Sequence, residues 1–422
     1  MAVGTGPLRR SRDFRQLWLA ALPAGMAMGA VSLALFVQAW ELTRSPSALG
    51  LLGLIQFAAL AAGTLGGSAI VDHIDRRLLL LFTQAGFGIT VLALWVGSLV
   101  GDPPILLLFA ASALGSCVAS LHFPTRSALI PAVVERSDLV ASMTLDTVVW
   151  NVTMILGPLI GGAVLARFGL SAVYGMAVLG HVLTISLLLR LDPQPSEDGR
   201  EGRLGLSAIR HGFAYLRRRR VLTGLLWVDL IAMAFGMRRA LFAILATEQF
   251  HRGPEVVGLL MAAIPAGALV VSLTAGWLGN VHRQGLTLMA SAAVWGAAIA
   301  GFGLSGSNLW IALTLLAVAG GADIVASILR ASIIQHEVSD GVRGRVWGVN
   351  FLVLNGGPRL GDLTAGMTAS AWGATFSVVS GGIASLIGTV VLAIAMPELL
   401  RYTSSEGIDR SDDATTPLRE EA

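Results

Sequence analysis

Six charged side chains lie inside stretches of the sequence that are otherwise apolar. They are Asp229, Asp323, Asp362, Arg238, Arg239 and Arg359. A charge is costly in such surroundings, and one found there usually faces a cavity or an oppositely charged partner. Guanidiniums suit charge-assisted hydrogen bonds to an anionic small-molecule substrate, and an aspartate that binds and releases protons can couple that substrate to a proton gradient. We therefore expect a substrate site at the arginines and a proton site at the carboxylates.

A structural interpretation of the same side chains is also open. Each can be one half of a buried ion pair, or can snorkel from a helix end toward the membrane interface. Arg359 and Asp362 have i, i+3 spacing, which places them on one helix face and allows them to pair. Asp146 and His181 also fall in apolar stretches, and we interpret them as packing residues.

The composition indicates that membrane helices position these charges. Of the 422 residues, 55% are hydrophobic and 13% are charged, whereas soluble domains are about 25% charged. A spanning helix needs roughly 20 apolar residues, and such stretches recur along the whole chain, bracketed by turn and charge signals. The expected spans are 16–41, 48–71, 78–100, 104–128, 140–165, 170–190, 221–247, 255–279, 285–304, 308–330, 346–370 and 374–396. The sequence therefore predicts an all-α membrane protein with twelve spans.

The distribution of basic residues indicates the orientation of these spans. The net charge is +3, and every basic side chain among the 29 is Arg. Of these, 23 fall on the side of the two termini, while the opposite loops hold only Arg44, Arg167 and Arg252. Arginine accumulates in cytoplasmic loops, so we expect both termini in the cytoplasm, in a bacterial inner membrane. The same distribution argues against nucleic acid as a partner and for the lipid bilayer.

Motifs of enzymes are missing from the sequence. It has no lysine for a phosphate-binding loop, no HExxH motif and a single cysteine, Cys117. We expect no enzymatic activity, no cofactor and no metal site. An ion gradient then remains as the energy source, with protons as the coupling ion, and we expect a monomer.

The chain also divides into two halves that resemble each other. Residues 125–130 match 329–334, and residues 156–162 match 356–362, at offsets of 204 and 200 residues. We expect a six-helix bundle at 1–190, a cytoplasmic linker with an amphipathic helix at 191–220, a second bundle at 221–400, and a disordered cytoplasmic tail at 401–422. Two like-oriented repeats place a substrate path between the halves.

The loop after the second expected span carries a recognisable pattern of charges. Residues 66–77 read Gly-Gly-Ser-Ala-Ile-Val-Asp-His-Ile-Asp-Arg-Arg, which resembles the cytoplasmic signature of the major facilitator superfamily. The resemblance implies the major facilitator fold, with small residues that allow close packing and with Asp72 paired to Arg126. His73 and Asp75 depart from the signature, which has arginine and glycine there. The gating residues implied in this loop and its partner helix are Gly67, Asp72, Asp75, Arg76, Arg77 and Arg126.

Two further resemblances bear on the activity. Gly157 and Pro158 lie in a segment that is similar to the end of the antiporter motif of the same superfamily, although Thr153 replaces its upstream glycine. Most of the chain resembles the enterobactin exporter group of catecholate-siderophore efflux proteins. The segments that carry this resemblance best are 237–242, 257–268, 344–346 and 360–362.

Together these patterns predict a proton-coupled exporter that works by alternating access on a siderophore or a similar amphipathic small molecule. Two alternatives stay open from the sequence. The first is a broad-specificity drug or macrolide efflux pump, because the same group includes such exporters. The second is a non-transporting membrane receptor on the same scaffold.

Overall fold

The computed structural model describes residues 6–71, 74–101, 103–193, 213–217, 219–236, 238–338 and 340–403. Within these ranges the chain is helical and contains no strand. The helices of the N-terminal half are α1 (Gly6–Arg10), α2 (Arg12–Thr43), α3 (Pro46–Val71), α4 (Arg76–Val100), α5 (Ile105–Leu129) and α6 (Leu139–Leu188). Those of the C-terminal half are α8 (Arg220–Ile231), α9 (Phe242–Glu248), α10 (Pro254–Leu273), α11 (Gln284–Gly303), α12 (Leu309–Glu337), α13 (Asp340–Trp372), α14 (Ala374–Ala395) and α15 (Pro397–Leu400).

The lengths of these helices suit a bilayer. Ten segments of the described chain are long and apolar enough to cross a membrane, which confirms the predicted all-helical membrane protein. One of the ten runs from Arg136 to Leu188, and its 53 residues exceed twice the roughly 20 that one crossing needs. Segment α13, which carries Arg359 and Asp362, is not among the ten.

Two glycines mark equivalent corners in the two halves. Gly169 interrupts α6 with φ 78° and ψ −178°, and Gly373 separates α13 from α14 with φ 87° and ψ 160°. This combination of angles is essentially restricted to glycine. The two positions are 204 residues apart, the offset that also relates residues 125–130 to 329–334. The chain therefore turns in the same way after the fifth and the eleventh expected spans.

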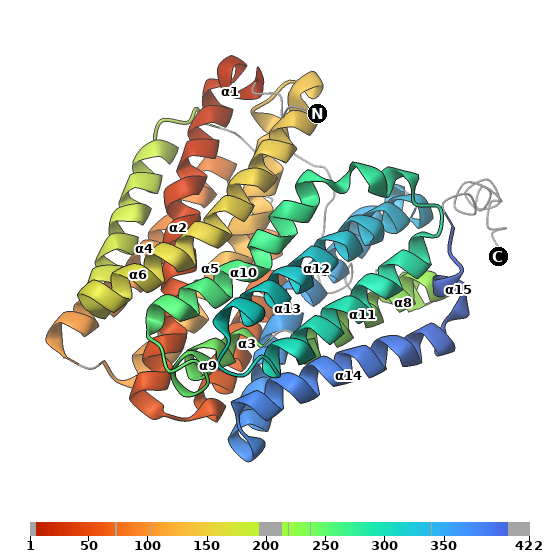
Figure 1. Ribbon diagram of the computed structural model, residues 1–422. Helices are drawn as coiled ribbons and strands as arrows, with labels where there is room; N and C mark the ends of the chain where they lie inside the picture. Colours follow the sequence, from red (N-terminus) through yellow and green to blue (C-terminus); the bar gives the residue numbers. More distant parts are fainter. Residues whose placement is uncertain are drawn as a thin grey trace, which may run out of the picture.

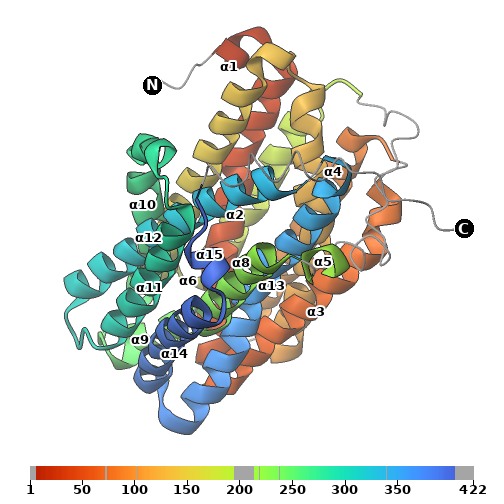
Figure 2. The same ribbon diagram turned by 90° about the vertical axis from the view of Figure 1, so that its right-hand side faces the viewer.

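Most of the contact between the two halves is made by two pairs of helices, α3 with α13 and α6 with α10. Figure 2 shows α3 beside α13. Glycines bring the backbones close: a Cβ at Gly366 would lie 2.7 Å from the Cα of Gly50, and one at Gly258 would lie 2.5 Å from the carbonyl oxygen of Pro158. These contacts lie at the end of the molecule where α3 and α10 begin. The opposite ends, which carry α1 and α15, diverge (Figure 1).

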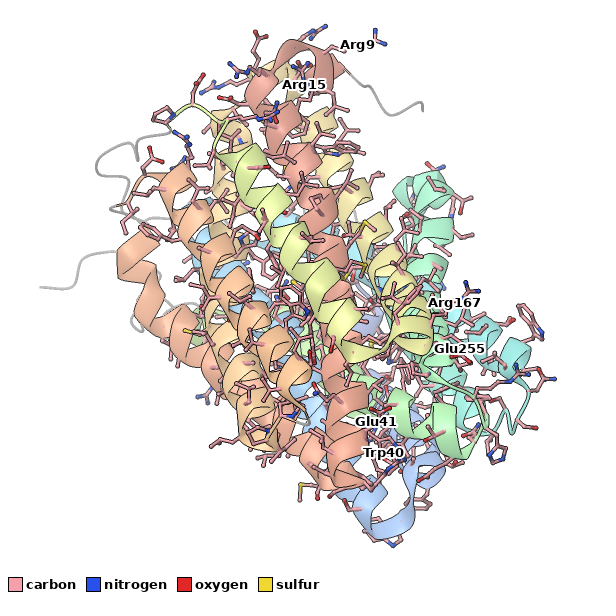
Figure 3. The ribbon with its side chains drawn as sticks, turned by 90° about the vertical axis from the view of Figure 1, so that its left-hand side faces the viewer. Arg9, Arg15, Trp40, Glu41, Arg167 and Glu255 are labelled. Carbon is pink, nitrogen blue, oxygen red and sulfur yellow. The ribbon has the colours of Figure 1, made fainter. Side chains whose placement is uncertain are left out.

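Charged side chains gather at the two ends of the bundle. Arg9 and Arg15 lie at the end that carries α1, whereas Glu41 lies toward the other end (Figure 3). Ser11 begins α2 by accepting a hydrogen bond from the backbone N–H of Phe14 at 3.0 Å, which satisfies one of the unpaired donors of the first turn. The ends of the helices are thus polar and their middles apolar, as a bilayer requires.

Candidate functional site

The segment between α8 and α9 is the least regular part of the C-terminal half. A π-helix runs from Ala232 to Gly236, and a 3-10 turn runs from Arg239 to Leu241. Neighbouring side chains bind the carbonyls of this segment: Trp295 Nε1 donates to Ala232 O at 3.3 Å, and Thr364 Oγ1 donates to Ala234 O at 2.9 Å. Irregular backbone at membrane depth needs such partners, and π-turns occur often at functional sites.

Asp362 of α13 binds the end of this irregular segment. Its Oδ1 accepts a hydrogen bond from the backbone N–H of Ala240 at 2.9 Å, and the residue is 2% exposed. The guanidiniums of Arg238, Arg239 and Arg359 all interact electrostatically with this carboxylate. The structure therefore brings four of the six charged residues singled out from the sequence into one buried cluster beside the broken helix.

The same cluster lies against the N-terminal half. A Cβ at Gly53 of α3 would lie 2.8 Å from Cβ of Asp362 and 2.9 Å from the carbonyl oxygen of Arg359. The α3–α13 contact therefore depends on a glycine at this position. Movement of α13 relative to α3 would change the surroundings of these charges directly.

Arg238 is held inside the C-terminal half by its own contacts. Its Nε donates to Phe235 O at 2.9 Å and one of its terminal nitrogens donates to Ser377 Oγ at 3.0 Å. A Cβ at Gly381 of α14 would lie 2.2 Å from the guanidinium, so the side chain fills the space that this glycine leaves. Arg239 is half-buried and has no such hydrogen bonds within the described chain.

Arg359 points away from its i, i+3 neighbour. One terminal nitrogen donates to Asn355 O in the preceding turn, and the residue lines a cavity in the N-terminal half. Its Nε is buried and has no hydrogen-bond partner in the described chain. The two side chains form no direct ion pair in the described chain: Oδ1 of Asp362 accepts from Ala240 N, and a terminal nitrogen of Arg359 donates to its own helix.

The other two carboxylates lie on α8 and α12 of the C-terminal half. Asp229 of α8 forms an ion pair with Arg330 of α12, and their side chains are 7% and 5% exposed. Arg330 also donates to Ser327 Oγ at 2.7 Å, and Asp323, about two turns earlier in α12, interacts electrostatically with Arg330. The structure thus brings Asp229 and Asp323 together around one arginine, whose partnership with Asp229 was not evident from the sequence.

A half-buried ion pair lies in the N-terminal half. Arg126 of α5 forms an ion pair with Asp146 of α6 and donates to Leu17 O of α2 at 3.3 Å. Asp72, the partner expected for Arg126, lies outside the described residues. From the sequence we interpreted Asp146 as a packing residue. The signal for the ion pair was that Asp146 lies in one expected span and Arg126 at the end of the preceding one.

Two histidines near this pair were not singled out as functional. His122 Nδ1 lies 3.0 Å from Thr83 Oγ1, and His181 Nδ1 lies 3.0 Å from Gln84 Oε1. Both imidazoles contact Phe87, with ring centroids 5.7 and 5.9 Å away. The sequence signal was the presence of these polar residues in three separate apolar stretches, which becomes meaningful only once the helices are packed together.

Residues of the charged loop after α3 form hydrogen bonds at the ends of three helices. Asp75 begins α4 by accepting a hydrogen bond from Leu78 N at 3.0 Å. Arg76 donates to Ala128 O at 3.2 Å, and Arg77 donates to Leu189 O at 2.6 Å. Cations at the carboxyl ends of helices satisfy unpaired carbonyls and the helix dipole. The arginines therefore tie α4 to the ends of α5 and α6; of Gly67 the structure describes only its place in α3.

The Gly157–Pro158 pair contacts helices of both halves. A Cβ at Gly157 would lie 2.9 Å from Met26 O of α2, so this glycine allows α6 to approach its own half closely. The carbonyl of Pro158 contacts Gly258 of α10, as described above.

No group of three or more His, Cys, Asp or Glu residues that could hold a metal ion occurs in the described chain.

Known proteins with similar sequences are membrane exporters. A family model described as a transmembrane secretion effector matches residues 2–420. The enterobactin exporter EntS of Shigella boydii is 28% identical over 402 residues, which cover 94% of this chain and 94% of that protein. EntS of Escherichia coli O1:K1 matches with the same identity and coverage. The resemblance to the enterobactin exporter group is thereby confirmed over nearly the whole chain.

Solved structures with the same fold are known. A POT family transporter in complex with 5-aminolevulinic acid superposes with a TM-score of 0.74 at 12% identity, covering 92% of this chain and 97% of that one. A bacterial homologue of the iron transporter ferroportin in an inward-facing state gives a TM-score of 0.70 at 14% identity, covering 93% and 99%. At such low identity the likeness establishes the fold alone.

Proposed function

The chain belongs to the transmembrane secretion effector family of the major facilitator superfamily, and we propose that it is a proton-coupled secondary active exporter that works by alternating access. Its substrate is a siderophore or a similar amphipathic small molecule, in keeping with the relatives named enterobactin exporter. The protein is a multi-pass protein of the bacterial inner membrane.

The observation that supports this proposal best is the buried charge cluster at the contact between the halves. Asp362 holds the broken segment of the seventh span through Ala240 N and at the same time lies against Gly53 of α3. A charge here is costly in lipid, and these charges lie where rocking of the two halves would change their surroundings. Such an arrangement couples substrate and proton binding to the movement of the halves.

We assign separate tasks to the charged residues. Arg239 and Arg359 bind the anionic part of the substrate, and Arg238 contributes by holding the irregular segment in place. Asp323 and Asp229 exchange the proton around Arg330, and Asp362 links proton binding to the cluster. The gating residues are Gly67, Asp72, Asp75, Arg76, Arg77, Arg126, Gly157 and Pro158.

The proposed topology has twelve spans with both termini in the cytoplasm. Division of α6 at Gly169 and inclusion of α13 add two to the ten segments counted by length and composition. Residues 1–190 and 221–400 then form two like-oriented bundles, joined by the cytoplasmic linker 191–220 and followed by the cytoplasmic tail 401–422. The divergence of the ends that carry α1 and α15 corresponds to opening toward the cytoplasm (Figure 1). We propose a monomer as the working unit.

Everted membrane vesicles test the function directly. With an imposed proton gradient, vesicles that contain the protein are expected to accumulate a catecholate siderophore and to release protons when it is added. Macrolides and dyes are expected to cause no proton release. A response to macrolides and dyes without a response to the siderophore would favour a broad drug pump, and no flux of any of these compounds would favour a receptor.

A further inference from the structure

A cavity within the N-terminal half has the size of one aromatic ring. It is lined mainly by α2, α4 and α5, with one residue each from α3, α6 and α13, and has a volume of about 150 Å³. An apolar cavity of about that volume binds benzene in another protein. Leu35, Val91 and Leu94 contribute to its apolar wall. The dimensions therefore admit one ring of a larger molecule.

One buried hydroxyl group in this cavity has no partner. Ser112 of α5 is 4% exposed, and its Oγ makes no hydrogen bond in the described chain. A buried polar group is costly unless it is hydrogen-bonded, and the exceptions call for an explanation. Because Ser112 lines the cavity, a ligand that carries a hydroxyl or another polar group would supply the missing bond.

His181 places a second hydrogen-bonding atom at the same cavity. Its Nδ1 lies 3.0 Å from Gln84 Oε1, and because an amide oxygen only accepts, Nδ1 carries the hydrogen. Nε2 is then left without a partner in the described chain and accepts a hydrogen bond when the ring is neutral. The imidazole also stacks on Phe87, with centroids 5.9 Å apart and an interplanar angle of 16°. These two side chains offer a ligand an aromatic surface beside an acceptor.

The opposite half of the protein contributes a cation to this cavity. Arg359 of α13 lines it, and the Nε of Arg359 is buried without a hydrogen-bond partner. Guanidinium groups form short, charge-assisted hydrogen bonds with carboxylates. A ligand with an anionic group at this place would pair with the guanidinium of Arg359 and would join the N-terminal half to α13.

We propose that the cavity binds a single aromatic ring that carries a carboxylate and a neighbouring hydroxyl group. The ring lies against Phe87, the carboxylate binds Arg359, and the hydroxyl binds between Ser112 and His181. The proposal rests on the proposed function in that this ring is part of the exported molecule. It adds to that function the place where an aromatic acid is recognised and the residues that recognise each of its groups.

Binding of small probes to the full-length protein in lipid nanodiscs tests the site. Salicylate has all three features, benzoate lacks the hydroxyl, phenol lacks the carboxylate, and cyclohexanecarboxylate lacks both the hydroxyl and the aromatic ring, so its matched partner is benzoate. Isothermal titration calorimetry is expected to rank salicylate first and to give each other probe an affinity lower by about three- to tenfold or more, as the loss of one hydrogen bond or stacking contact implies.

Variants assign each group to its residue. Arg359→Gln is expected to remove the preference for salicylate over phenol, Ser112→Ala the preference for salicylate over benzoate, and Phe87→Leu the preference for benzoate over cyclohexanecarboxylate. Each result is a ratio of two affinities measured on the same variant. A general loss of folded protein would lower both affinities and leave their ratio unchanged. Equal ratios in the wild type and in all three variants would overturn the proposal.

A glycine offers a way to fill the cavity without disturbing the helix. Gly115 of α5 lines the cavity, and a Cβ there would meet no atom within 4 Å. Gly115→Leu is expected to abolish salicylate binding at an unchanged unfolding temperature, whereas Gly115→Ala, its matched control, is expected to retain binding. Unchanged binding in Gly115→Leu would contradict the proposed site.

Transport and binding can fail separately. If salicylate binds as described but vesicles export no siderophore, the proposed function is wrong and the site stands. If vesicles export a siderophore and Gly115→Leu exports it as well as the wild type does, the function stands and the ring site is wrong.

Discussion

Arg330 of α12 donates a hydrogen bond to Asp229 of α8, and both side chains are almost completely buried. The equivalent arginine of the N-terminal half is Arg126, 204 residues earlier, and it pairs with Asp146 of α6. The two halves thus keep the arginine but bring its aspartate from non-equivalent helices, from the seventh expected span in one case and the fifth in the other. In the C-terminal half a further carboxylate, Asp323, acts on the same arginine.

The first prediction concerns the stability of the Asp229–Arg330 pair. Asp229→Asn leaves a buried guanidinium without its counter-charge, which costs about 3–5 kcal/mol in buried pairs. The thermal unfolding midpoint in detergent is expected to fall clearly. Asp146→Asn, at the more exposed pair with side chains 16% and 26% exposed, is expected to lower the midpoint less.

The double variant Asp229→Leu with Arg330→Met is the control for this prediction. It removes both charges and fills their space with apolar side chains, a replacement that is often neutral or stabilising for buried pairs. Its unfolding midpoint is expected to recover toward the wild type. A double variant as unstable as Asp229→Asn would mean that the charges themselves do not account for the loss.

The second prediction separates proton coupling from substrate binding at Asp323. Asp323→Asn keeps the shape of the side chain but can no longer exchange a proton. Uptake driven by a proton gradient in everted vesicles is expected to stop, while exchange of labelled for unlabelled substrate at equal pH on both sides continues. Glu248→Gln, at an exposed position near the end of α9, is the matched control and should behave as the wild type. Gradient-driven uptake by Asp323→Asn would remove this residue from the coupling step.

The third prediction distinguishes the two neighbouring arginines of the broken helix. Arg238 donates to Phe235 O and Ser377 Oγ, so Arg238→Ala is expected to lower the unfolding midpoint. Arg239 has no such bonds in the described chain, so Arg239→Ala is expected to weaken substrate binding with little change in the midpoint. Calorimetry and thermal unfolding on the same preparations measure both quantities. A lower unfolding midpoint in Arg239→Ala and weaker substrate binding in Arg238→Ala would mean that Arg238 binds the substrate and Arg239 holds the segment.

The sequence allowed the helical fold and the repeat to be predicted because both depend on local signals. Apolar runs of about the bilayer thickness mark the spans, and a repeated segment such as 125–130 marks equivalent helix ends. The sequence predicted that Arg238, Arg239, Arg359 and Asp362 are charges within spans. It did not predict that they lie together. Their common contact with the irregular segment became visible once α13 was placed beside it.

The contacts that the sequence could not provide are those between distant helices. The partnership of Arg330 with Asp229 joins residues 101 positions apart, and no periodicity in either helix specifies it. The i, i+3 spacing of Arg359 and Asp362 suggested a pair that the tertiary structure overrides, since Ala240 N binds the carboxylate. The cavity near His181 likewise requires six helices to be packed before its polar groups face one space.

The fourth prediction concerns the glycine at the contact between the halves. A Cβ at Gly53 would lie 2.8 Å from Asp362 Cβ and 2.9 Å from Arg359 O, so Gly53→Ala must push α13 away, at a cost of about 1–3 kcal/mol for overpacking. Gly66→Ala in the same helix is the control, because a Cβ there meets no atom within 4 Å. We expect Gly53→Ala to favour the conformation in which α3 and α13 separate at this end.

Spin labels can measure that separation. Leu51 and Met367 are 41% and 63% exposed and lie next to the glycines of this contact, so labels at these two positions in a Cys117→Ser background report on its width. Longer distances are expected in Gly53→Ala than in Gly66→Ala. Identical distance distributions would show that the contact tolerates the methyl group and does not control the conformation.

The last prediction uses the two equivalent corner glycines. Gly169 and Gly373 both combine a positive φ with an extended ψ, and a side chain in that conformation costs about 1–3 kcal/mol. Neither position has an atom within 4 Å of an added Cβ, so strain of the backbone is the only cost. Gly169→Ala and Gly373→Ala are each expected to lower the unfolding midpoint by a similar amount. The double variant should show the sum, because distant sites add. Gly276→Ala, which has equal free space without a positive φ, is expected to leave the midpoint unchanged. A fall as large in Gly276→Ala would show that the corners are not special.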